Sequence, residues 1–482
     1  MSVRPPVVTI LGHVDHGKTT LLDFVRKSRI AAKEFGGITQ RIGAYEIKTG
    51  IKGYKNDRIT FVDTPGHETF AQLRARGANV ADIALLLIDA KDSLMPQTVE
   101  SISHIKAAKI PFVVVLNKTD LPEANPEKVK TDLLKHQVMV EGKGGTVPVV
   151  NISAKTGQGV NDLLETILLL SSDLNLTFDE NKAPLAYVIE TKKDKRGIVA
   201  SLIIKEGQIK VGDSVYALNV KGKVKSLIND MGKPMRAVIP SSPFELLGFE
   251  SLPMVGAKVT DQATDSPDNT KSVKTKKVFD LDSIIKPVEE EKKLSLIIKT
   301  DSFGSLEATT HSLANNKNLN IILSAVGDIN KSDVFLAKTT KSVIVGFNAK
   351  ADLTVKDLAK QEKVIIKSYN IIYELLEELN EVADLIKEKE EKEKSLKGEA
   401  KIQAGFIIEG EKVLGIKVTK GKINLGDMLE IYRQNNPIGK SKLVSLKIRA
   451  KRVTEVKKDQ EAGMIVSPQL DIRTGDVVKS IL

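Results

Sequence analysis

Gly-His-Val-Asp-His-Gly-Lys-Thr, at residues 12–19, is the stretch that decides the fold of the N-terminal part of the chain. It follows an apolar run at 7–11 and precedes a helix-like run at 20–27, so a strand, a loop and a helix are predicted in that order. Backbone N–H groups of such a loop cradle phosphates at the start of the helix. Lys18 would neutralise the β- and γ-phosphates, and the Thr19 hydroxyl would bind Mg²⁺. A Gly-rich turn without a ligand fits the same letters, so the motifs that follow must distinguish the two.

A carboxylate at the end of the next apolar strand is the first of these motifs, in Asp-Thr-Pro-Gly-His at 63–67. Asp63 is placed to hold Mg²⁺ through a water molecule, and Gly66 offers a backbone N–H to the γ-phosphate and a hinge. His67 is predicted to position the attacking water, because phosphoryl transfer needs an aligned water more than covalent chemistry. The pocket motifs hold no arginine finger, so we expect slow hydrolysis that an outside partner stimulates.

Two further motifs predict a pocket for guanine. Asn-Lys-Thr-Asp at 117–120 follows the apolar run 112–116, so Asp120 can accept hydrogen bonds from N1 and the 2-amino group of the base. Adenine lacks these donors. Ser-Ala-Lys at 153–155 also follows an apolar run, and it offers a backbone N–H to the guanine O6 and a lysine stem to cover the ring.

Thr39, within Gly-Gly-Ile-Thr-Gln at 36–40, completes the predicted chemistry, because a switch segment would place its hydroxyl on Mg²⁺ only while the γ-phosphate is present. Surface loops explain each motif alone, but they do not explain all of them in this order. The residues predicted to bind GTP are Gly12, His13, Val14, Asp15, His16, Gly17, Lys18, Thr19, Thr20, Asp63, Thr64, Pro65, Gly66, Asn117, Lys118, Thr119, Asp120, Ser153, Ala154 and Lys155. The residues predicted to bind Mg²⁺ are Thr19, Thr39 and, through water, Asp63.

The composition excludes several classes of protein. The chain has 482 residues and no cysteine, so several domains are expected, and disulfides and thiolate metal sites are excluded. Because no apolar run of eighteen residues and no apolar leader occurs, we expect a cytoplasmic protein that neither spans a membrane nor is secreted. The net charge is +11, and residues 397–482 hold 17 Lys and Arg against 10 Asp and Glu. This surplus suits RNA, although a merely soluble basic surface explains charge alone equally well.

Hydrophobic patterning predicts a multidomain α/β plus β protein. A parallel sheet with helices on both faces comes first, and short β-rich runs between glycines then indicate a small barrel. A polar linker, a second α/β layer, a long helix and another strand-rich barrel follow. The predicted bounds are 1–172 for the P-loop GTPase domain, 180–262 for the β-barrel domain, 263–288 for the linker, 289–366 for the α/β domain, 367–397 for the linker helix and 398–482 for the C-terminal β-barrel.

The long helix is predicted from Tyr369 to about Lys397, without Gly or Pro inside it. Apolar residues recur at three- and four-residue steps as far as Ile386, and the remainder is charged all round. At 1.5 Å per residue it would reach roughly 40 Å and hold the terminal domain away from the others. A helix that frays at its charged end is the alternative.

The two barrels share a short sequence. Gly-Gln-Ile-Lys-Val-Gly-Asp at 207–213 matches Gly-Lys-Ile-Asn-Leu-Gly-Asp at 421–427, and residues 472–476 repeat the ending, so both barrels are predicted to be variants of one unit. In the second barrel, residues 446–451 alternate between apolar and basic. This places a basic stripe on one strand face, which suits a phosphate backbone or only protects an edge strand. Few aromatic residues lie near it, so base stacking is not predicted. The residues predicted to contact tRNA are Lys447, Arg449 and Lys451.

These motifs resemble those of bacterial-type translation initiation factor two, within the translational GTPases. The narrower matches are Gly36–Tyr45, Leu73–Ala78, Met95–Thr98 and Val345–Asn348. The resemblance implies a monomer that binds GTP and Mg²⁺, places formylmethionyl initiator tRNA on the small ribosomal subunit and promotes joining of the large one. GTP is then hydrolysed on the assembled ribosome. It also implies that Val14 and Ile38 form a hydrophobic gate beside His67, and that the terminal barrel holds the formylmethionyl end. The first barrel and the α/β layer would contact the ribosome, and neither DNA nor a membrane is a partner.

The sequence departs from this family in three respects. Members carry a long N-terminal extension, whereas this chain begins at the GTPase domain, and Arg41 stands where His is common. In the terminal barrel, the cysteines of the family are replaced by Ile416 and Ala462, and the Arg-Phe-Lys element is lost around residues 448–450. Two other functions are compatible with the motifs: another translational-type GTPase, such as an elongation factor or a sulfate-activation subunit, and a non-hydrolysing, GTP-sensing RNA-binding scaffold.

Overall fold

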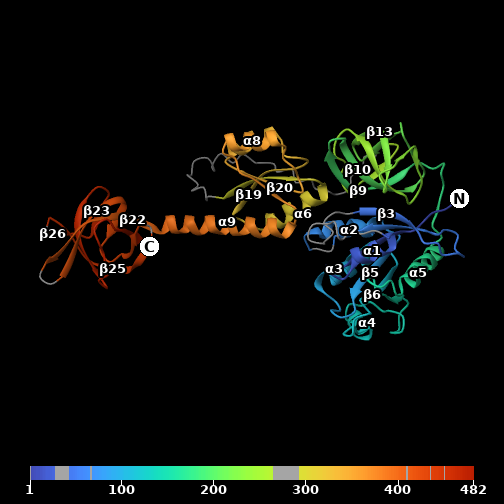
Figure 1. Cartoon of the computed structure of the whole chain (residues 1–482), viewed down its shortest axis with the longest axis horizontal. Coiled ribbons are helices and arrows are strands. Elements are labelled where there is room, and N and C mark those ends of the chain that lie inside the picture. Colours follow the sequence, from blue (N-terminus) through green and yellow to red (C-terminus); the bar gives the residue numbers. More distant parts are fainter. Residues whose placement is uncertain are drawn as a thin grey trace. The chain divides into compact units, whose positions relative to one another are not determined.

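The computed structural model describes residues 2–27, 43–65, 68–263, 293–408, 411–434, 436–449 and 451–481 (Figure 1). Its elements form two compact units, of which the first ends at Leu379 and the second begins at Asn380. No helix among the described residues is long and apolar enough to cross a membrane.

A six-stranded sheet opens the first unit, in the order β3-β4-β2-β5-β6-β7, and β3 alone runs antiparallel to its neighbour. Two apolar clusters cover its faces, one with α1 and α5 and the other with α2, α3 and α4, so the sheet is doubly wound as predicted. The strands are β2 (Val7–Gly12), β3 (Gly43–Lys48), β4 (Arg58–Asp63), β5 (Ile83–Asp89), β6 (Phe112–Asn117) and β7 (Val149–Asn151). The helices are α1 (Lys18–Arg26), α2 (Ala71–Val80), α3 (Pro96–Ala108), α4 (Pro126–Lys135) and α5 (Val160–Asp173).

The next domain of the first unit is a closed barrel of antiparallel strands. The ring runs β12-β17-β9-β10-β16-β13 and closes through the β12–β13 pair around an apolar core. Its strands are β9 (Leu185–Asp194), β10 (Gly197–Glu206), β12 (Ser214–Ala217), β13 (Val220–Asn229), β16 (Pro243–Phe249) and β17 (Lys258–Thr260).

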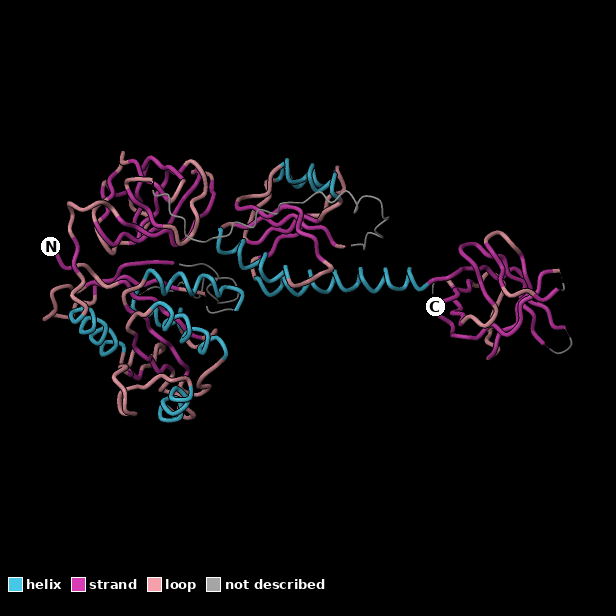
Figure 2. The backbone as a smooth tube through the Cα atoms, turned by 180° about the vertical axis from the view of Figure 1, so that it is seen from behind, coloured by secondary structure: helices cyan, strands magenta, loops and turns pink. Residues whose placement is uncertain are grey.

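The third domain of this unit is a four-stranded parallel sheet in the order β19-β18-β20-β21 (Figure 2). Helices α6 and α9 pack on one face, and α7 and α8 pack on the other. The elements are β18 (Leu294–Thr300), α6 (Phe303–Ala314), β19 (Leu319–Val326), α7 (Lys331–Thr340), β20 (Val343–Phe347), α8 (Leu353–Gln361), β21 (Ile366–Tyr369) and α9 (Ile372–Ser395). The sequence patterns named neither α8 nor β21.

The predicted start of the long helix, at 367 to 369, is wrong. Residues up to Tyr369 instead pair with β20 as the last strand of the sheet, and α9 begins at Ile372. Its first turns bury Ile372, Leu375 and Leu379 against that sheet, because these residues form the apolar face of the helix and pack with the apolar side chains of the strands. The helix then continues through the charged residues to Ser395, so it does not fray where the apolar face ends.

The second unit ends in another closed barrel, with the ring β24-β29-β22-β23-β28-β25. If the six strands of each ring are numbered along the chain, both rings read 3-6-1-2-5-4. The common strand order therefore confirms the prediction, made from the shared sequence, that the two barrels are variants of one unit. The strands are β22 (Leu396–Ile408), β23 (Glu411–Asn424), β24 (Met428–Arg433), β25 (Asn436–Ile448), β28 (Glu461–Ser467) and β29 (Val477–Ile481).

The shared sequence forms one recurrent turn. In each of its three copies, a Gly with φ between 91° and 99° precedes an Asp whose carboxylate accepts the backbone N–H three residues earlier. The N–H donors lie 2.7 to 2.9 Å from Asp213, Asp427 and Asp476. A fourth copy ends in Gly256-Ala257, with the same backbone hydrogen bonds but no carboxylate, and the sequence comparison missed it for that reason.

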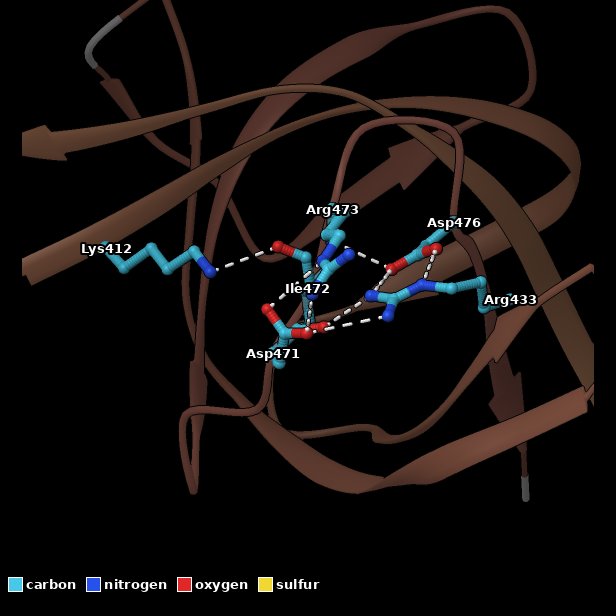
Figure 3. Close-up of polar contacts among 6 residues, drawn as sticks. All are labelled: Lys412, Arg433, Asp471, Ile472, Arg473 and Asp476. Carbon is cyan, nitrogen blue, oxygen red and sulfur yellow. Dashed lines mark hydrogen bonds and ion pairs between the residues drawn. The ribbon is translucent and has the colours of Figure 1, made fainter.

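Asp476 also anchors a side-chain cluster in the second barrel (Figure 3). Its two carboxylate oxygens each accept a hydrogen bond from the Arg433 guanidinium at 3.0 Å. Arg433 further donates to the backbone carbonyl of Asp471 at 2.6 Å, and Lys412 donates to that of Ile472 at 3.0 Å. The loop before β29 is thus fixed to the neighbouring strands.

A buried ion cluster joins the doubly wound domain to the first barrel. Asp82 accepts two hydrogen bonds from Arg4, at 2.6 and 2.8 Å, one from Lys205 at 2.8 Å and one from the Val7 N–H at 2.8 Å. Burial alone would raise the pKa of Asp82, but the hydrogen bond from Arg4 and the charge of Lys205 outweigh it and hold the pKa below its ordinary value. Burial lowers the pKa of Lys205 to about 8 despite this partner.

A second joint connects the barrel to the α/β layer. Glu190 on β9 is 5% exposed, and its carboxylate accepts the Gly304 N–H at 3.1 Å and the Ser302 hydroxyl at 3.1 Å. Both donors belong to the N-terminus of α6, where unpaired N–H groups favour an anion. Burial raises the pKa of Glu190, and these hydrogen bonds oppose that shift.

Candidate functional site

The loop at residues 12–19 connects the end of β2 to α1, as the sequence predicts. Gly12 has φ 150°, and a Cβ there would lie 2.3 Å from the Leu87 carbonyl oxygen. Gly17 has φ 92°, and a Cβ there would lie 2.3 Å from Asn117 Nδ2. Both positions therefore require glycine, because the backbone passes other groups too closely for a side chain.

Lys18 is held at the mouth of this loop. Its Nζ donates hydrogen bonds to the carbonyls of Gly12 at 3.0 Å and His13 at 2.5 Å. Burial lowers the pKa of Lys18 to about 8, although the Asp63 carboxylate opposes the shift. An anion placed in the loop would favour the charged ammonium, which is the role predicted for Lys18 toward phosphates.

The two histidines of the loop are held neutral. His16 is 1% exposed, its Nδ1 lies 3.3 Å from the Leu87 carbonyl, and burial lowers its pKa to about 4. Burial and the nearby Lys18 ammonium lower the pKa of His13 as well. At neutral pH the cationic charge of the loop is therefore that of Lys18.

Asp63 lies beside the loop because β4 pairs with β2 in register Ile10↔Asp63. It is 8% exposed, and the adjacent Thr64 hydroxyl donates to the Ile10 carbonyl at 2.8 Å. Thr19 lies in the first turn of α1. A hydroxyl and a carboxylate are donors that suit Mg²⁺ with phosphate and water as its other ligands. Among the described residues, no group of three His, Cys, Asp or Glu could hold a metal without such help.

The base-side motifs meet around one cavity of about 220 Å³ at the ends of β6 and β7. The cavity is lined by Gly17, Thr20, Asn117, Lys118, Asp120, Leu121, Ser153, Ala154 and Lys155. The structure thus brings together residues from the two segments that the sequence predicts to bind guanine and from the loop that it predicts to bind the phosphates. Leu121 is the one lining residue that the sequence prediction omitted.

Asn117 contributes to this pocket by holding its loops together. Its Nδ2 donates to the His16 carbonyl at 2.8 Å, and its Oδ1 accepts the Ala154 N–H at 2.9 Å. Lys118 pairs with the buried Asp89, with Nζ and Oδ2 2.6 Å apart. Thr119 hydrogen-bonds the Ile152 carbonyl through both its hydroxyl, at 2.9 Å, and its N–H, at 3.2 Å. The motif therefore also orders the pocket wall.

Four predicted residues lie outside the described residues: Ile38, Thr39, Gly66 and His67. Their predicted roles as gate, metal ligand, γ-phosphate contact and water-positioning group stay predictions. Val14, the other predicted gate residue, lies within the described loop, and its N–H donates to Gln97 Oε1 at 3.1 Å.

The sequence prediction missed three residues around the phosphate end. Besides Gln97, these are Arg74 and Glu100, which pair with two hydrogen bonds of 2.8 and 2.7 Å. Arg74 is 0% exposed, and it also donates to the Pro65 carbonyl at 3.2 Å. Gln97 and Glu100 are three residues apart on α3 and so lie on one helix face. That spacing was visible in the sequence, but the partners of these side chains were not.

The predicted basic stripe in the second barrel is wrong. Strand β25 ends at Ile448, and the chain turns back at once, with Ile448 paired to Lys451. Arg449 has φ 46° in that turn, so Lys447, Arg449 and Lys451 do not share one strand face. Alternating apolar and basic residues lie on opposite strand faces only while the chain stays extended. A turn of two residues is enough to reverse the chain and end this pattern.

A cavity of about 920 Å³ lies beside this turn in the second barrel. Phe406 and Val413 provide apolar surface, Lys447 and Arg449 provide positive charge, and Asp459 and Glu461 provide negative charge. Two of the three predicted tRNA-contact residues thus line one cavity, whereas Lys451 does not belong to its lining.

Comparison with known proteins divides the chain into three matched segments. Residues 4–172 match the elongation factor Tu GTP binding domain, residues 184–262 match elongation factor G domain 2, and residues 269–380 match translation-initiation factor 2.

Curated relatives match over the full chain. Translation initiation factor IF-2 of Bartonella henselae is 41% identical over 100% of this chain and 59% of its own length. That of Thermus thermophilus is 40% identical over 99% of this chain and 86% of its own. A crystal structure of GDP-bound aIF5B from Aeropyrum pernix matches with 24% identity and a TM-score of 0.47, over 100% of this chain and 92% of its own. The chain spans about three fifths of the length of the Bartonella relative.

Proposed function

Because the chain belongs to the family of translation initiation factor IF-2, we propose that it is a GTP-dependent initiation factor of the cytoplasm. It places formylmethionyl initiator tRNA on the small ribosomal subunit, promotes joining of the large subunit and hydrolyses GTP on the assembled ribosome. It acts as a monomer, with GTP and Mg²⁺ as its ligands. The observation that carries the proposal is the pocket in which three separate predicted segments line one cavity next to the loop that holds Lys18.

The phosphate end supports GTP binding and hydrolysis. The glycines let the backbone N–H groups of residues 12–19 approach phosphates, and Lys18 meets them with an ammonium whose charge they stabilise. Thr19, Thr39 and, through water, Asp63 would hold Mg²⁺, which would neutralise charge on the phosphates when bound. His67 orients the attacking water, and Val14 is part of the apolar gate beside it. Since no arginine finger is among the predicted pocket residues, the ribosome is needed to place His67.

A GTPase assay with and without ribosomes tests this half of the proposal. We expect slow turnover by the protein alone and a large stimulation by assembled ribosomes, which His67→Ala abolishes without changing GTP affinity. An absence of turnover both with and without ribosomes would favour the non-hydrolysing scaffold instead. A stimulated rate that survives His67→Ala would remove the role assigned to that side chain.

The cavity of the second barrel supports binding of an aminoacylated RNA end. Apolar Phe406 and Val413 suit a methionyl side chain, while Lys447 and Arg449 suit the phosphates that precede it. Ile416 and Ala462, which replace the family's cysteines, are buried in the barrel core.

Filter binding tests the tRNA half, by comparing formylmethionyl initiator tRNA with an elongator tRNA. We expect tighter binding of the formylated tRNA, and a weaker complex for Lys447→Glu combined with Arg449→Glu. Lys442→Glu is the matched control, because Lys442 is exposed on the same strand but does not line the cavity. Equal affinity for both tRNAs would refute selectivity, and equal loss in the control would show that only overall charge matters.

A further inference from the structure

One face of α3 contacts both sides of the phosphate end of the pocket, through Gln97 and Glu100. We propose that the pair Arg74–Glu100 positions the segment that leads into His67, and that Gln97 positions Val14 opposite it. This inference rests on the proposed GTPase activity and adds three positioning residues to it. They act on GTP hydrolysis through the backbone that they hold, not by touching the nucleotide.

Arg74 is the centre of this arrangement. It lies on α2, its side chain is 0% exposed, and its Nη2 donates to Glu100 Oε1 at 2.8 Å and Oε2 at 2.7 Å. Its Nη1 donates to the Pro65 carbonyl at 3.2 Å. Glu100 in turn lies 3.1 Å from His104 Nε2 on the next turn of α3. The guanidinium is therefore fixed by a carboxylate that is itself held, and its two terminal nitrogens bond different partners, Nη2 to Glu100 and Nη1 to Pro65.

The Pro65 carbonyl matters because Pro65 directly precedes Gly66 and His67, which the sequence predicts to contact the γ-phosphate and to position the water. By bonding this carbonyl, Arg74 holds the last described residue before them.

The packing of α2 keeps Arg74 in place. A Cβ on Gly77 would lie 2.7 Å from Thr64 Cγ2 and 2.9 Å from Thr9 Oγ1, so the helix is seated directly on the strand ends beside Pro65. The Thr64 hydroxyl is bonded to the Ile10 carbonyl at 2.8 Å. The residues before the hydrolysis segment are thus held from both sides.

Gln97 acts on the opposite wall. Its Oε1 accepts the Val14 N–H at 3.1 Å, and its own backbone carbonyl accepts the Ser101 hydroxyl at 2.7 Å. Val14 is the predicted gate residue of the described loop. Because Gln97 and Glu100 share one helix face, α3 holds Val14 directly and Pro65 through Arg74.

A purely structural role for this ion pair predicts lower stability without a specific loss of turnover. Arg74→Lys separates the two roles, because it keeps the charge but cannot form the two-pronged contact to Glu100 together with the bond to Pro65. The stimulated kcat should fall about 100-fold, the loss typical of a misplacement by about 1 Å, while the Kd for GTP stays within about twofold. Gln97→Ala should lower kcat about tenfold, as expected for one lost hydrogen bond near 1.4 kcal/mol.

Arg4→Lys is the matched control, since Arg4 also donates to both carboxylate oxygens of one acidic side chain, Asp82, and its own side chain is only 10% exposed. We expect a lower melting temperature but a stimulated kcat within about twofold of wild type, because no pocket residue depends on Arg4. Glu100→Gln is the second test variant in case Arg74→Lys does not fold. Glu100 is 29% exposed and tolerates the change, and kcat should fall about tenfold because Arg74 loses a charged acceptor.

The outcomes distinguish a failure of the proposed function from a failure of this inference alone. Wild-type protein that hydrolyses no GTP with ribosomes overturns the proposed function, and this inference falls with it. If the wild type hydrolyses GTP with ribosomes, and Arg74→Lys and Glu100→Gln both keep a stimulated kcat within threefold of the wild-type value, the inference alone is overturned. A parallel loss of kcat in Arg4→Lys also overturns it, because that would trace the effect to general destabilisation. A loss confined to kcat in the α2 and α3 variants supports it.

Discussion

The joint at Asp82 allows a quantitative prediction. Asp82→Asn removes the carboxylate that pairs with both Arg4 and Lys205, whose side chains are 10% and 12% exposed. Breaking a buried ion pair by removing one partner costs about 3 to 5 kcal/mol, because a charge is left buried without compensation. At about 2.1 cal/mol/K of unfolding entropy per residue, each kcal/mol lowers the melting temperature of a unit of about 370 residues by about 1.3 °C. We therefore expect the transition of the first unit to shift down by about 4 to 7 °C.

The loss should depend on pH, because Lys205 can lose its proton. Its pKa in the folded protein is about 8, below the 10.5 of an ordinary lysine. Between these two values the unfolded chain binds more protons, so the contribution of this group to stability rises with pH. In Asp82→Asn the pKa of Lys205 falls further, because its counter-charge is gone. The deficit of the variant relative to wild type should therefore be larger at pH 6.5 than at pH 9.

Differential scanning calorimetry of the full chain at both pH values measures this shift. Asp357→Asn serves as the control, since Asp357 is exposed on α8 of the same unit and should change the melting temperature little. Hydrogen exchange in peptides that cover β2 and β10 would report whether the joint itself opens. An Asp82→Asn protein that melts within 2 °C of wild type at pH 6.5 would refute the reasoning, as would a deficit that grows toward pH 9.

Three further predictions concern the pocket and the barrels. The pKa of Lys18 is about 8, and phosphates would raise it, so GTP binding should take up about half a proton at pH 8 and less at pH 6.5. This uptake is measured from binding enthalpies in buffers that differ in their heat of ionisation. Proton release would contradict the prediction. Gly17→Ala should weaken nucleotide binding about tenfold or more in a fluorescence titration, because its φ of 92° and its approach to Asn117 exclude a Cβ, and unchanged affinity would disprove that strain. Asp476→Asn should lower the melting temperature of the second unit, whereas Asp213→Asn should lower that of the first unit much less, because only Asp476 also holds an arginine; equal shifts would count against this difference.

The sequence predicted what depends on local chemistry. The motif at residues 12–19 required a strand before it and a helix after it, and the glycines at 12 and 17 occupy backbone positions that other residues cannot take. The internal echo predicted two related barrels because each copy encodes a self-contained turn, in which a glycine and a carboxylate three residues from its donor are sufficient.

The sequence did not predict what depends on partners distant in the chain. The functions of Arg74, Gln97 and Glu100 arise only where α2 and α3 pack beside β2 and β4. The stripe at Lys447 failed because a turn of two residues leaves no trace in a pattern of alternation. Tyr369 was assigned to a helix because its neighbours continue the helical spacing, whereas the sheet needed a fourth strand.

Glu190 has a consequence for the α/β layer. In open parallel sheets, ligands bind where the strand order reverses, outside the carboxyl ends of the strands. Here that reversal lies between β18 and β20, and α6 begins directly after β18, so the Glu190 carboxylate occupies the position of an anionic ligand.

The barrel therefore supplies the layer with a tethered ligand of its own. Because both partners belong to one chain, the contact forms at a high effective concentration that does not depend on how much protein is present. Such a contact can be individually weak and still be mostly closed, and a change of about 1.4 kcal/mol in its free energy would shift the ratio of closed to open molecules tenfold.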